Sequence, residues 1–186
     1  AADDEIIRRY LTAKVNKKRG AKNDDEIYKL ELLMNNANLT VEDRKCLVAA
    51  NKVAEETSAP AAAIELPDGT MVTGKTSLLL GCASAALLNT LKKSADMPDV
   101  TLIDPNVIKP IQALKTEHLG AKNPRLHTNE VLIALSVSAL TDDNAKEAMA
   151  QLSKLKNSEQ TVKRGRKCNQ TIRYSSDILG REIKFS

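Results

Sequence analysis

Residues 61–93 constrain the fold of this chain more than any other stretch, because several strong local signals follow one another there without a gap. An apolar run is followed by a Pro-Asp-Gly turn, a β-branched run, a Gly-Lys-Thr-Ser tetrad and a long apolar segment. Asp68-Gly69, between the runs at residues 64–66 and 71–73, is a strong signal for a β-hairpin. The stretch therefore predicts two paired strands and then a helix from about Leu78.

The same stretch matches the G-x-x-x-x-G-K-[ST] pattern of a loop whose backbone N–H groups cradle phosphates. The match runs from Gly69 to Thr76, but its interior at residues 70–73 is bulky or β-branched. A backbone that wraps a phosphate needs small residues there, so we favour the hairpin and keep the phosphate loop as the alternative. With either structure, residues 74–77 would lie between a strand end and a helix start, where an anion is attracted. The plainer alternative is an exposed lysine beside an N-cap hydroxyl.

Composition limits the classes of protein that the chain can belong to. Its 186 residues suffice for one good core, and its aromatic content of only 2% leaves the core to aliphatic residues and provides poorly for stacking on nucleic-acid bases. The three cysteines are odd in number, which favours a reducing compartment over a disulfide framework. Cys82, within an apolar segment, is expected to be a small buried side chain.

No targeting or membrane signal is apparent in the sequence. The longest apolar run, residues 131–140, is too short to span a bilayer, and the acidic N-terminus is not typical of a signal peptide. We therefore predict a soluble, cytoplasmic protein.

Three short amphipathic helices are predicted ahead of the hairpin, with N-cap signals at Asp3 or Asp4, at Asn23 with Glu26, and at Thr40. Ser58-Ala59-Pro60 marks a boundary, which divides the chain into a helical segment, residues 1–57, and an α/β domain, residues 58–186.

Further elements are predicted beyond residue 93. Residues 100–103 are predicted to form a buried strand, and Asp104-Pro105 to begin a helix in which Pro110 causes a kink or shifts the start. Alternating strands and helices predict a layered α/β fold with a small mixed sheet.

A second concentration of polar side chains lies in residues 115–130, KTEHLGAKNPRLHTNE. Lys115, His118, Lys122, Arg125 and His127 are predicted to share one connector ahead of a helix that Thr128 could cap. Cationic groups, the Asn123 amide and a helix start can together receive a phosphate or a carboxylate.

The C-terminal tail carries the basic character of the chain. Residues 154–186 hold nine Lys and Arg against three Asp and Glu, including the cluster at residues 163–167. Such a cluster can bind nucleic acid nonspecifically, although it is more often a solvated loop. Residues 171–174 are predicted to form an edge strand.

Several runs of residues resemble the C-terminal domain of a bacterial family known as domain of unknown function 1846. The runs are residues 5–10, 64–69, 72–77, 114–117, 122–128 and 130–136. The resemblance covers about residues 4–156, and the tail departs from it. Family members are longer, with an N-terminal part whose own Gly-rich, lysine-containing stretch resembles a phosphate loop. The resemblance thus implies either a fragment or a free-standing version of the domain, and it carries no reaction with it.

The first functional hypothesis is an anion-binding domain for a nucleotide or another phosphorylated small molecule. Lys75 and Arg125 would neutralise charge, while Thr76 and Asn123 would orient the ligand, provided that the two loops meet in space. The expected site residues are Lys75, Thr76, Ser77, Lys122, Asn123, Arg125 and His127.

Two other functions stay open. The second is a structural or oligomerisation module that supports a missing N-terminal catalytic domain, with a broad apolar patch on the first three helices. The third is nonspecific nucleic-acid binding through the tail. The sequence shows no paired carboxylates, no metal-ligand spacing and no nucleophile with a visible base. We therefore assign no catalytic residue, no metal and no cofactor, and leave open whether the protein is an enzyme.

Overall fold

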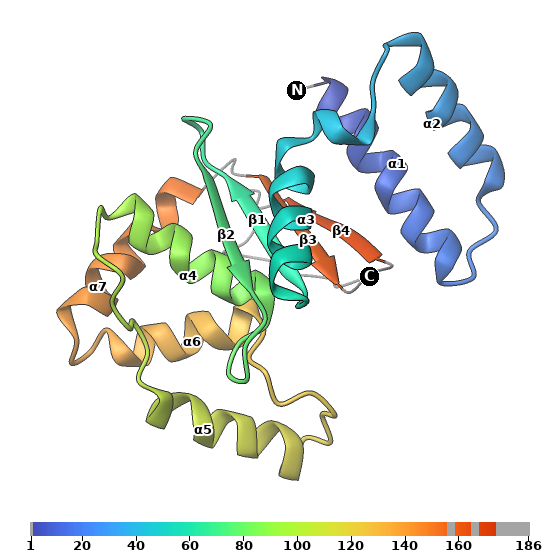
Figure 1. Ribbon diagram of the computed structural model, residues 1–186. Coiled ribbons are helices and arrows are strands. Elements are labelled where there is room, and N and C mark those ends of the chain that lie inside the picture. Colours follow the sequence, from blue (N-terminus) through green and yellow to red (C-terminus); the bar gives the residue numbers. More distant parts are fainter. Residues whose placement is uncertain (1, 156–158, 165–167, 174–186) are drawn as a thin grey trace.

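A computed structural model describes the backbone of residues 2–155, 159–164 and 168–173, and the side chains of residues 2–155. The described strands are β1 (Ala61–Glu65), β2 (Met71–Lys75), β3 (Glu159–Arg164) and β4 (Cys168–Arg173). They form one sheet in the order β2-β1-β3-β4, and each neighbouring pair is antiparallel (Figure 1). We expected a sheet with mixed strand pairing. Within the described residues the sheet is antiparallel, and the parallel pairing is one isolated bridge outside the strands. β4 supplies the predicted edge strand, and Tyr174 lies outside the described residues.

The predicted hairpin at Asp68-Gly69 is confirmed. The Leu66 N–H donates to the Thr70 carbonyl at 2.9 Å, and the Gly69 N–H donates to the Leu66 carbonyl at 2.9 Å. Gly69 adopts φ +83°, in the left-handed region that glycine enters without strain. The residues that follow are strand β2, so the extended backbone between Gly69 and Gly74 does not wrap a phosphate. The phosphate-loop alternative was wrong because β-branched residues at these positions favour pairing with β1.

β1 is covered on both faces, which makes the fold a three-layer α/β structure. Ala62 and Ile64 pack against α4 (Cys82–Ser94), whereas Ala63 packs against α3 (Lys45–Thr57) on the opposite face. Successive side chains of a strand point to opposite faces, so one short strand joins both helical layers. Cys82 is buried in the α4 layer, as expected.

Gly74 sets how closely α4 approaches the sheet. A Cβ atom at this position would lie 2.1 Å from the backbone nitrogen of Ala86. No residue with a side chain fits there unless β2 or α4 moves.

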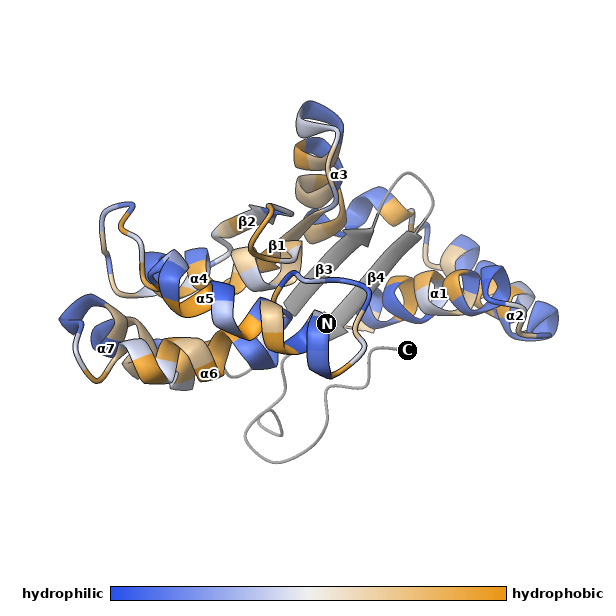
Figure 2. Ribbon diagram, turned by 90° about the horizontal axis from the view of Figure 1, so that it is seen from below, coloured by the Kyte–Doolittle hydropathy of each residue, from blue (hydrophilic) through white to orange (hydrophobic). Residues whose placement is uncertain are grey.

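The N-terminal region begins with the predicted helices α1 (Ala2–Lys18) and α2 (Asp24–Asn36), which pack together (Figure 2). α1 also lies against β4. Asn23 occupies the N-cap position of α2, but its side-chain amide donates to the Ala13 carbonyl at 3.0 Å and so ties α2 to α1. Thr40 caps a short 3₁₀ turn, η1 (Val41–Asp43), that precedes α3. α3 packs on β1; the proposed division between residues 57 and 58 stays a prediction.

The remaining helices pack on the outer side of α4. They are α5 (Pro105–Ala113), a π-helical turn η2 (Leu114–His118), α6 (Thr128–Ser138), α7 (Asp143–Ala150) and the 3₁₀ turn η3 (Gln151–Leu155). Leu87 and Leu91 of α4 meet Val131 and Leu135 of α6 in the largest buried cluster. In the described part of the chain, no helix is both long enough and apolar enough to cross a membrane.

The strand predicted at residues 100–103 was wrong. This segment is a loop that starts with a turn, in which the Val100 N–H donates to the Pro98 carbonyl at 2.8 Å. Leu102 and Ile103 are nevertheless buried, because a short apolar run predicts burial without deciding between a strand and a buried loop. Asp104 caps α5 as predicted: its Oδ1 accepts the Asn106 N–H at 2.7 Å. Pro110 lies within α5.

Candidate anion-binding site

α4 begins at Cys82, four residues beyond the predicted start at Leu78. The difference arises at Ser77, whose hydroxyl oxygen accepts the N–H groups of Leu79 at 3.2 Å and Leu80 at 3.0 Å. These bonds offer the backbone a local turn in place of a helix. The Gly-Lys-Thr-Ser tetrad therefore ends a strand and enters a loop, and the start of α4 is formed by residues that follow it.

A parallel bridge between Leu80 and Leu126 brings the two predicted loops together. The Leu126 N–H donates to the Leu79 carbonyl at 2.9 Å, and the Gly81 N–H donates to the Leu126 carbonyl at 3.1 Å. Because the two segments run in the same direction and a helix starts shortly after each, the N-termini of α4 and α6 lie side by side. The Ser84 hydroxyl also donates to the Leu126 carbonyl, at 2.9 Å, and links the first turn of α4 to this bridge.

A cavity of about 240 Å³ lies where the two helices begin. Its wall consists of Pro60, Thr76, residues 81–84, Asn123, Arg125 and residues 127–128. No Asp or Glu is among these wall residues. The charged side chain of the wall is therefore the Arg125 guanidinium, beside the titratable His127 imidazole and the positive ends of two helix dipoles.

The structure brings four of the seven expected site residues to this cavity: Thr76, Asn123, Arg125 and His127. Lys75, Ser77 and Lys122 are exposed and are not part of its wall. Lys75 is the last residue of β2, and its neighbour Thr76 is the first residue of the tetrad to reach the cavity. The two loops do meet, but the lysines of both loops lie outside the wall.

Arg125 is held by one hydrogen bond from its side chain and one from its backbone. Its Nε donates to the Ser77 carbonyl at 2.6 Å, and its backbone N–H donates to Asn123 Oδ1 at 3.2 Å. Within residues 2–155, no hydrogen bond from the terminal guanidinium nitrogens to another residue is found. One edge of the guanidinium is thus used for positioning, and the rest is available to a ligand.

Thr128, the first residue of α6, is the one wall residue with a buried polar group left unsatisfied in the described part of the chain. The residue is only 1% exposed, and its Oγ1 has no hydrogen-bond partner there. Burying a hydroxyl without a partner costs about 1–3 kcal/mol, so this oxygen is a candidate contact for a ligand.

Lys115 is a positioning residue that the sequence did not reveal. We expected it in a polar loop, but it is buried in the π-helical turn, where its Nζ donates to the Arg125 carbonyl and to Glu130 Oε2, both at 2.7 Å. Glu130 Oε2 also accepts the His127 N–H at 2.7 Å. Lys115 therefore fixes the backbone on either side of Leu126 from behind the cavity. His118, in the same turn, is exposed and outside the wall.

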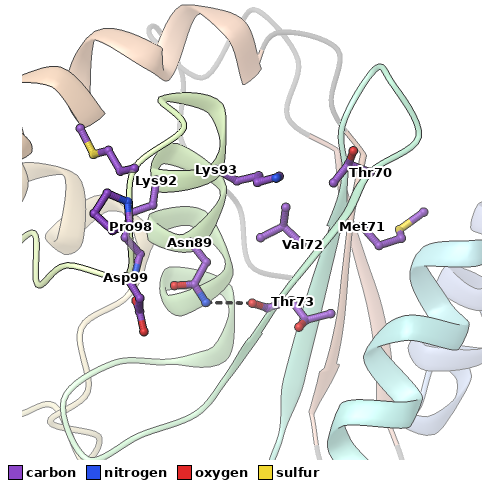
Figure 3. A pocket seen from close by; sticks show the side chains of 10 residues that line it. Thr70, Met71, Val72, Thr73, Asn89, Lys92, Lys93, Pro98 and Asp99 are labelled. Atoms are coloured by element: carbon purple, nitrogen blue, oxygen red, sulfur yellow. Dashed lines mark hydrogen bonds and ion pairs between the residues drawn. The ribbon is translucent and has the colours of Figure 1, made fainter.

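A second cavity, of about 430 Å³, lies between β2 and the C-terminal half of α4 (Figure 3). Lys92 forms an ion pair with Asp99 in its wall, and the hydrogen bond from Lys92 lowers the pKa of Asp99 below its ordinary value. Asn89 donates to the Thr73 carbonyl at 2.9 Å, which covers part of the β2 edge (Figure 3). Lys92 and Asn89 are thus matched with partners in the wall of this cavity, whereas Lys93 also lines it.

Two other sequence predictions concern metals and the tail. Among residues whose side chains are described, no group of three or more His, Cys, Asp and Glu could hold a metal ion. The basic cluster at residues 163–167 falls largely outside the described residues, since 165–167 are not described and no side chain beyond residue 155 is.

Comparison with known proteins places a family match across most of the described chain. Residues 42–164 match a family described as "Domain of unknown function DUF1846, C-terminal". A UPF0371 protein of Corynebacterium efficiens is 52% identical over 157 residues, which are 84% of this chain and 32% of that protein. A UPF0371 protein of Streptococcus pneumoniae serotype 19F is 51% identical over 160 residues, which are 86% of this chain and 32% of that protein. The chain spans about a third of the length of these relatives.

Proposed function

This chain belongs to the DUF1846 C-terminal domain family, whose description names no reaction, and we therefore propose a function from the geometry: it binds a phosphate-containing small molecule where α4 and α6 begin. One observation carries the proposal. The parallel bridge at Leu80 and Leu126 sets two helix N-termini and Arg125 around one cavity that no carboxylate lines.

The electrostatics of the cavity support an anionic ligand. Each helix N-terminus acts as roughly half a positive charge, which favours an anion. Arg125 adds a full charge in a planar arrangement of donors that suits phosphate oxygens. Asn123 and Thr76 add neutral polar groups to the same wall. An anion is thus attracted by the backbone and by one oriented side chain.

A phosphate titration with two matched variants tests this proposal. Inorganic phosphate is titrated into the full chain by calorimetry, and Arg125→Gln is compared with Lys93→Gln, which removes the same charge from the second cavity. We expect Arg125→Gln to weaken binding about tenfold or more, since a charge-assisted hydrogen bond contributes about 1.5–3 kcal/mol. Lys93→Gln should change the affinity less than about twofold. Equal losses in both variants, or no saturable binding to the unmodified chain, would reject the site.

A second candidate function, packing against another protein unit, is favoured by α6. This helix carries apolar residues on two sides: Val131 and Leu135 face the core, yet Ile133 and Val137 are 63% and 52% exposed, and Leu140 just beyond the helix is 82% exposed. The three exposed positions form one stripe, and an exposed apolar stripe marks a site where another protein unit can pack. On the first three helices, where we expected an apolar patch, Tyr28, Leu32 and Leu33 are exposed on α2 and Val48 is exposed on α3.

The occupant that we propose for this stripe is the additional chain of the longer family members, because this chain spans only about a third of them. The part of the pneumococcal relative outside the matched region is mixed with this chain and analysed by size-exclusion chromatography. Co-elution that Val137→Asp abolishes and Leu32→Asp leaves intact would support the candidate. Absence of co-elution, or loss with Leu32→Asp alone, would reject it.

A further inference from the structure

The cavity at the starts of α4 and α6 is small for the ligands that phosphate sites often hold. Its volume of about 240 Å³ lies below the roughly 300–1,000 Å³ of pockets that enclose drug-sized molecules. No Tyr or Phe is among its wall residues, and a nucleotide base would find no ring to stack on there. The cavity, which is partly open to solvent, has room for a phosphate group with a few further heavy atoms.

The charge of the wall favours a dianion over a monoanion. Arg125 and two helix N-termini face the cavity, and no acidic side chain of the wall offsets them. A phosphomonoester carries about −1.5 to −2 charges at neutral pH, whereas a phosphodiester or a carboxylate carries about −1. The monoester can also accept hydrogen bonds at three oxygens, which matches donors that approach from several sides.

The buried hydroxyl of Thr128 is an independent indication of a ligand. Its Oγ1 has no partner in the described part of the chain, although the residue is 99% buried and lies in the cavity wall. The neighbouring Ser84 hydroxyl already donates to the Leu126 carbonyl. Thr128 is therefore the wall hydroxyl whose hydrogen-bonding capacity a bound oxygen would satisfy.

From these observations we infer that the site takes a small phosphomonoester, of about three to six carbons, and that Thr128 and Arg125 are its specificity-determining contacts. The inference rests on the proposed function and narrows its ligand class. The second cavity suits this role less, because its wall includes the Asp99 carboxylate, with which Lys92 is paired.

The test compares the affinities of defined probes for the full chain, and each affinity is measured by calorimetry. The probes are inorganic phosphate, glycerol phosphate as a three-carbon monoester, adenosine monophosphate, and a carboxylate of matched size. We expect glycerol phosphate to bind at least about tenfold more tightly than adenosine monophosphate or the carboxylate, and all phosphate binding to depend on Arg125.

Thr128 is tested with two variants that keep its volume or its hydroxyl. Thr128→Val is expected to weaken glycerol phosphate about five- to tenfold, whereas Thr128→Ser should stay within about twofold of the unmodified chain. Thermal unfolding without ligand identifies a variant that fails to fold. If Thr128→Val fails, Thr128→Ala, which also removes the hydroxyl, takes its place in the comparison with Thr128→Ser.

The outcomes separate the two claims. Equal or tighter binding of adenosine monophosphate, lost in Arg125→Gln, would overturn the small-ligand inference and leave the proposed function standing. Full retention of glycerol phosphate affinity in Thr128→Val would overturn the role of that hydroxyl. No saturable binding of any phosphate probe would overturn both the inference and the proposed function.

Discussion

The two ends of α4 each border a cavity, and they differ in how their positive charge is used. At the C-terminal end, Lys92 and Lys93 line the cavity, but Lys92 is paired with the Asp99 carboxylate of the same wall, and Asn89 covers part of the β2 edge. At the N-terminal end, Arg125 and two helix starts line the other cavity, and no carboxylate is part of its wall. We infer from this difference that anion binding depends less on the number of lysines near a cavity than on how many of their charges are already paired with carboxylates.

The largest expected effect concerns the close contact between Gly74 of β2 and Ala86 of α4, the helix that borders both cavities. In Gly74→Ala, the new Cβ would lie 2.1 Å from the Ala86 nitrogen, so β2 and α4 must separate. We expect a loss of about 3 kcal/mol in the free energy of unfolding, measured by chemical denaturation.

Gly81→Ala is the matched control, because a Cβ there would lie 3.6 Å from the Leu126 carbonyl oxygen. Its cost should stay below about 1 kcal/mol. Similar stabilities of the two variants would show that the β2–α4 contact does not hold both ends of the helix in place.

The next effect is specific to the N-terminal end. Lys115→Met removes the ammonium that bonds the Arg125 carbonyl and Glu130, and leaves a partly buried carboxylate without its counter-charge. We expect a loss of about 2 kcal/mol in stability and a weaker affinity for phosphate, because Arg125 and His127 lose their support. Lys122→Met, at an exposed position, should change stability by less than about 0.5 kcal/mol. If Lys115→Met bound phosphate as well as the unmodified chain, its positioning role would be excluded.

The smallest effect belongs to the C-terminal end and depends on pH. The hydrogen bond from Lys92 and its charge lower the pKa of Asp99 below the ordinary 3.8. A carboxyl with a lowered folded-state pKa stabilises the fold above its unfolded value and loses that contribution as the pH falls through the folded value. Thermal unfolding of Asp99→Asn should therefore show a slight deficit at neutral pH that disappears below about pH 3.8, and that added salt reduces. A deficit that persists in acid would contradict this account.

The sequence predicts the local features of this fold well and its non-local contacts poorly. The hairpin follows from Asp68-Gly69 and the α5 cap from Asp104, because turn and cap signals act over a few neighbouring residues. Gly74 matches a phosphate-loop pattern only in its residue type. Its actual constraint is the approach of Ala86, which no local signal reveals.

The site shows the same division. The residue types in both loops predict an anion site, but their meeting depends on the bridge between Leu80 and Leu126, which lie far apart in the sequence. Thr76 and Arg125 reach the cavity, whereas Lys75, the last residue of β2, is exposed outside its wall. The role of Lys115 depends on its pairing with Glu130 across the π-helical turn and the loop that follows. Neither contact carries a local pattern that sequence analysis could have used.

The most direct test of an anion site at the starts of α4 and α6 is a phosphate titration of the ¹⁵N-labelled chain, in which the backbone amide signals at both ends of α4 are monitored by NMR. We expect the amide signals of residues 82–84 and 127–129 to shift together and saturate, while those of Lys92 and Lys93 remain in place. Saturable shifts at Lys92 and Lys93 of equal size would contradict this expectation. So would shifts that grow linearly across the whole chain, because they would show that phosphate finds no particular site at the starts of α4 and α6.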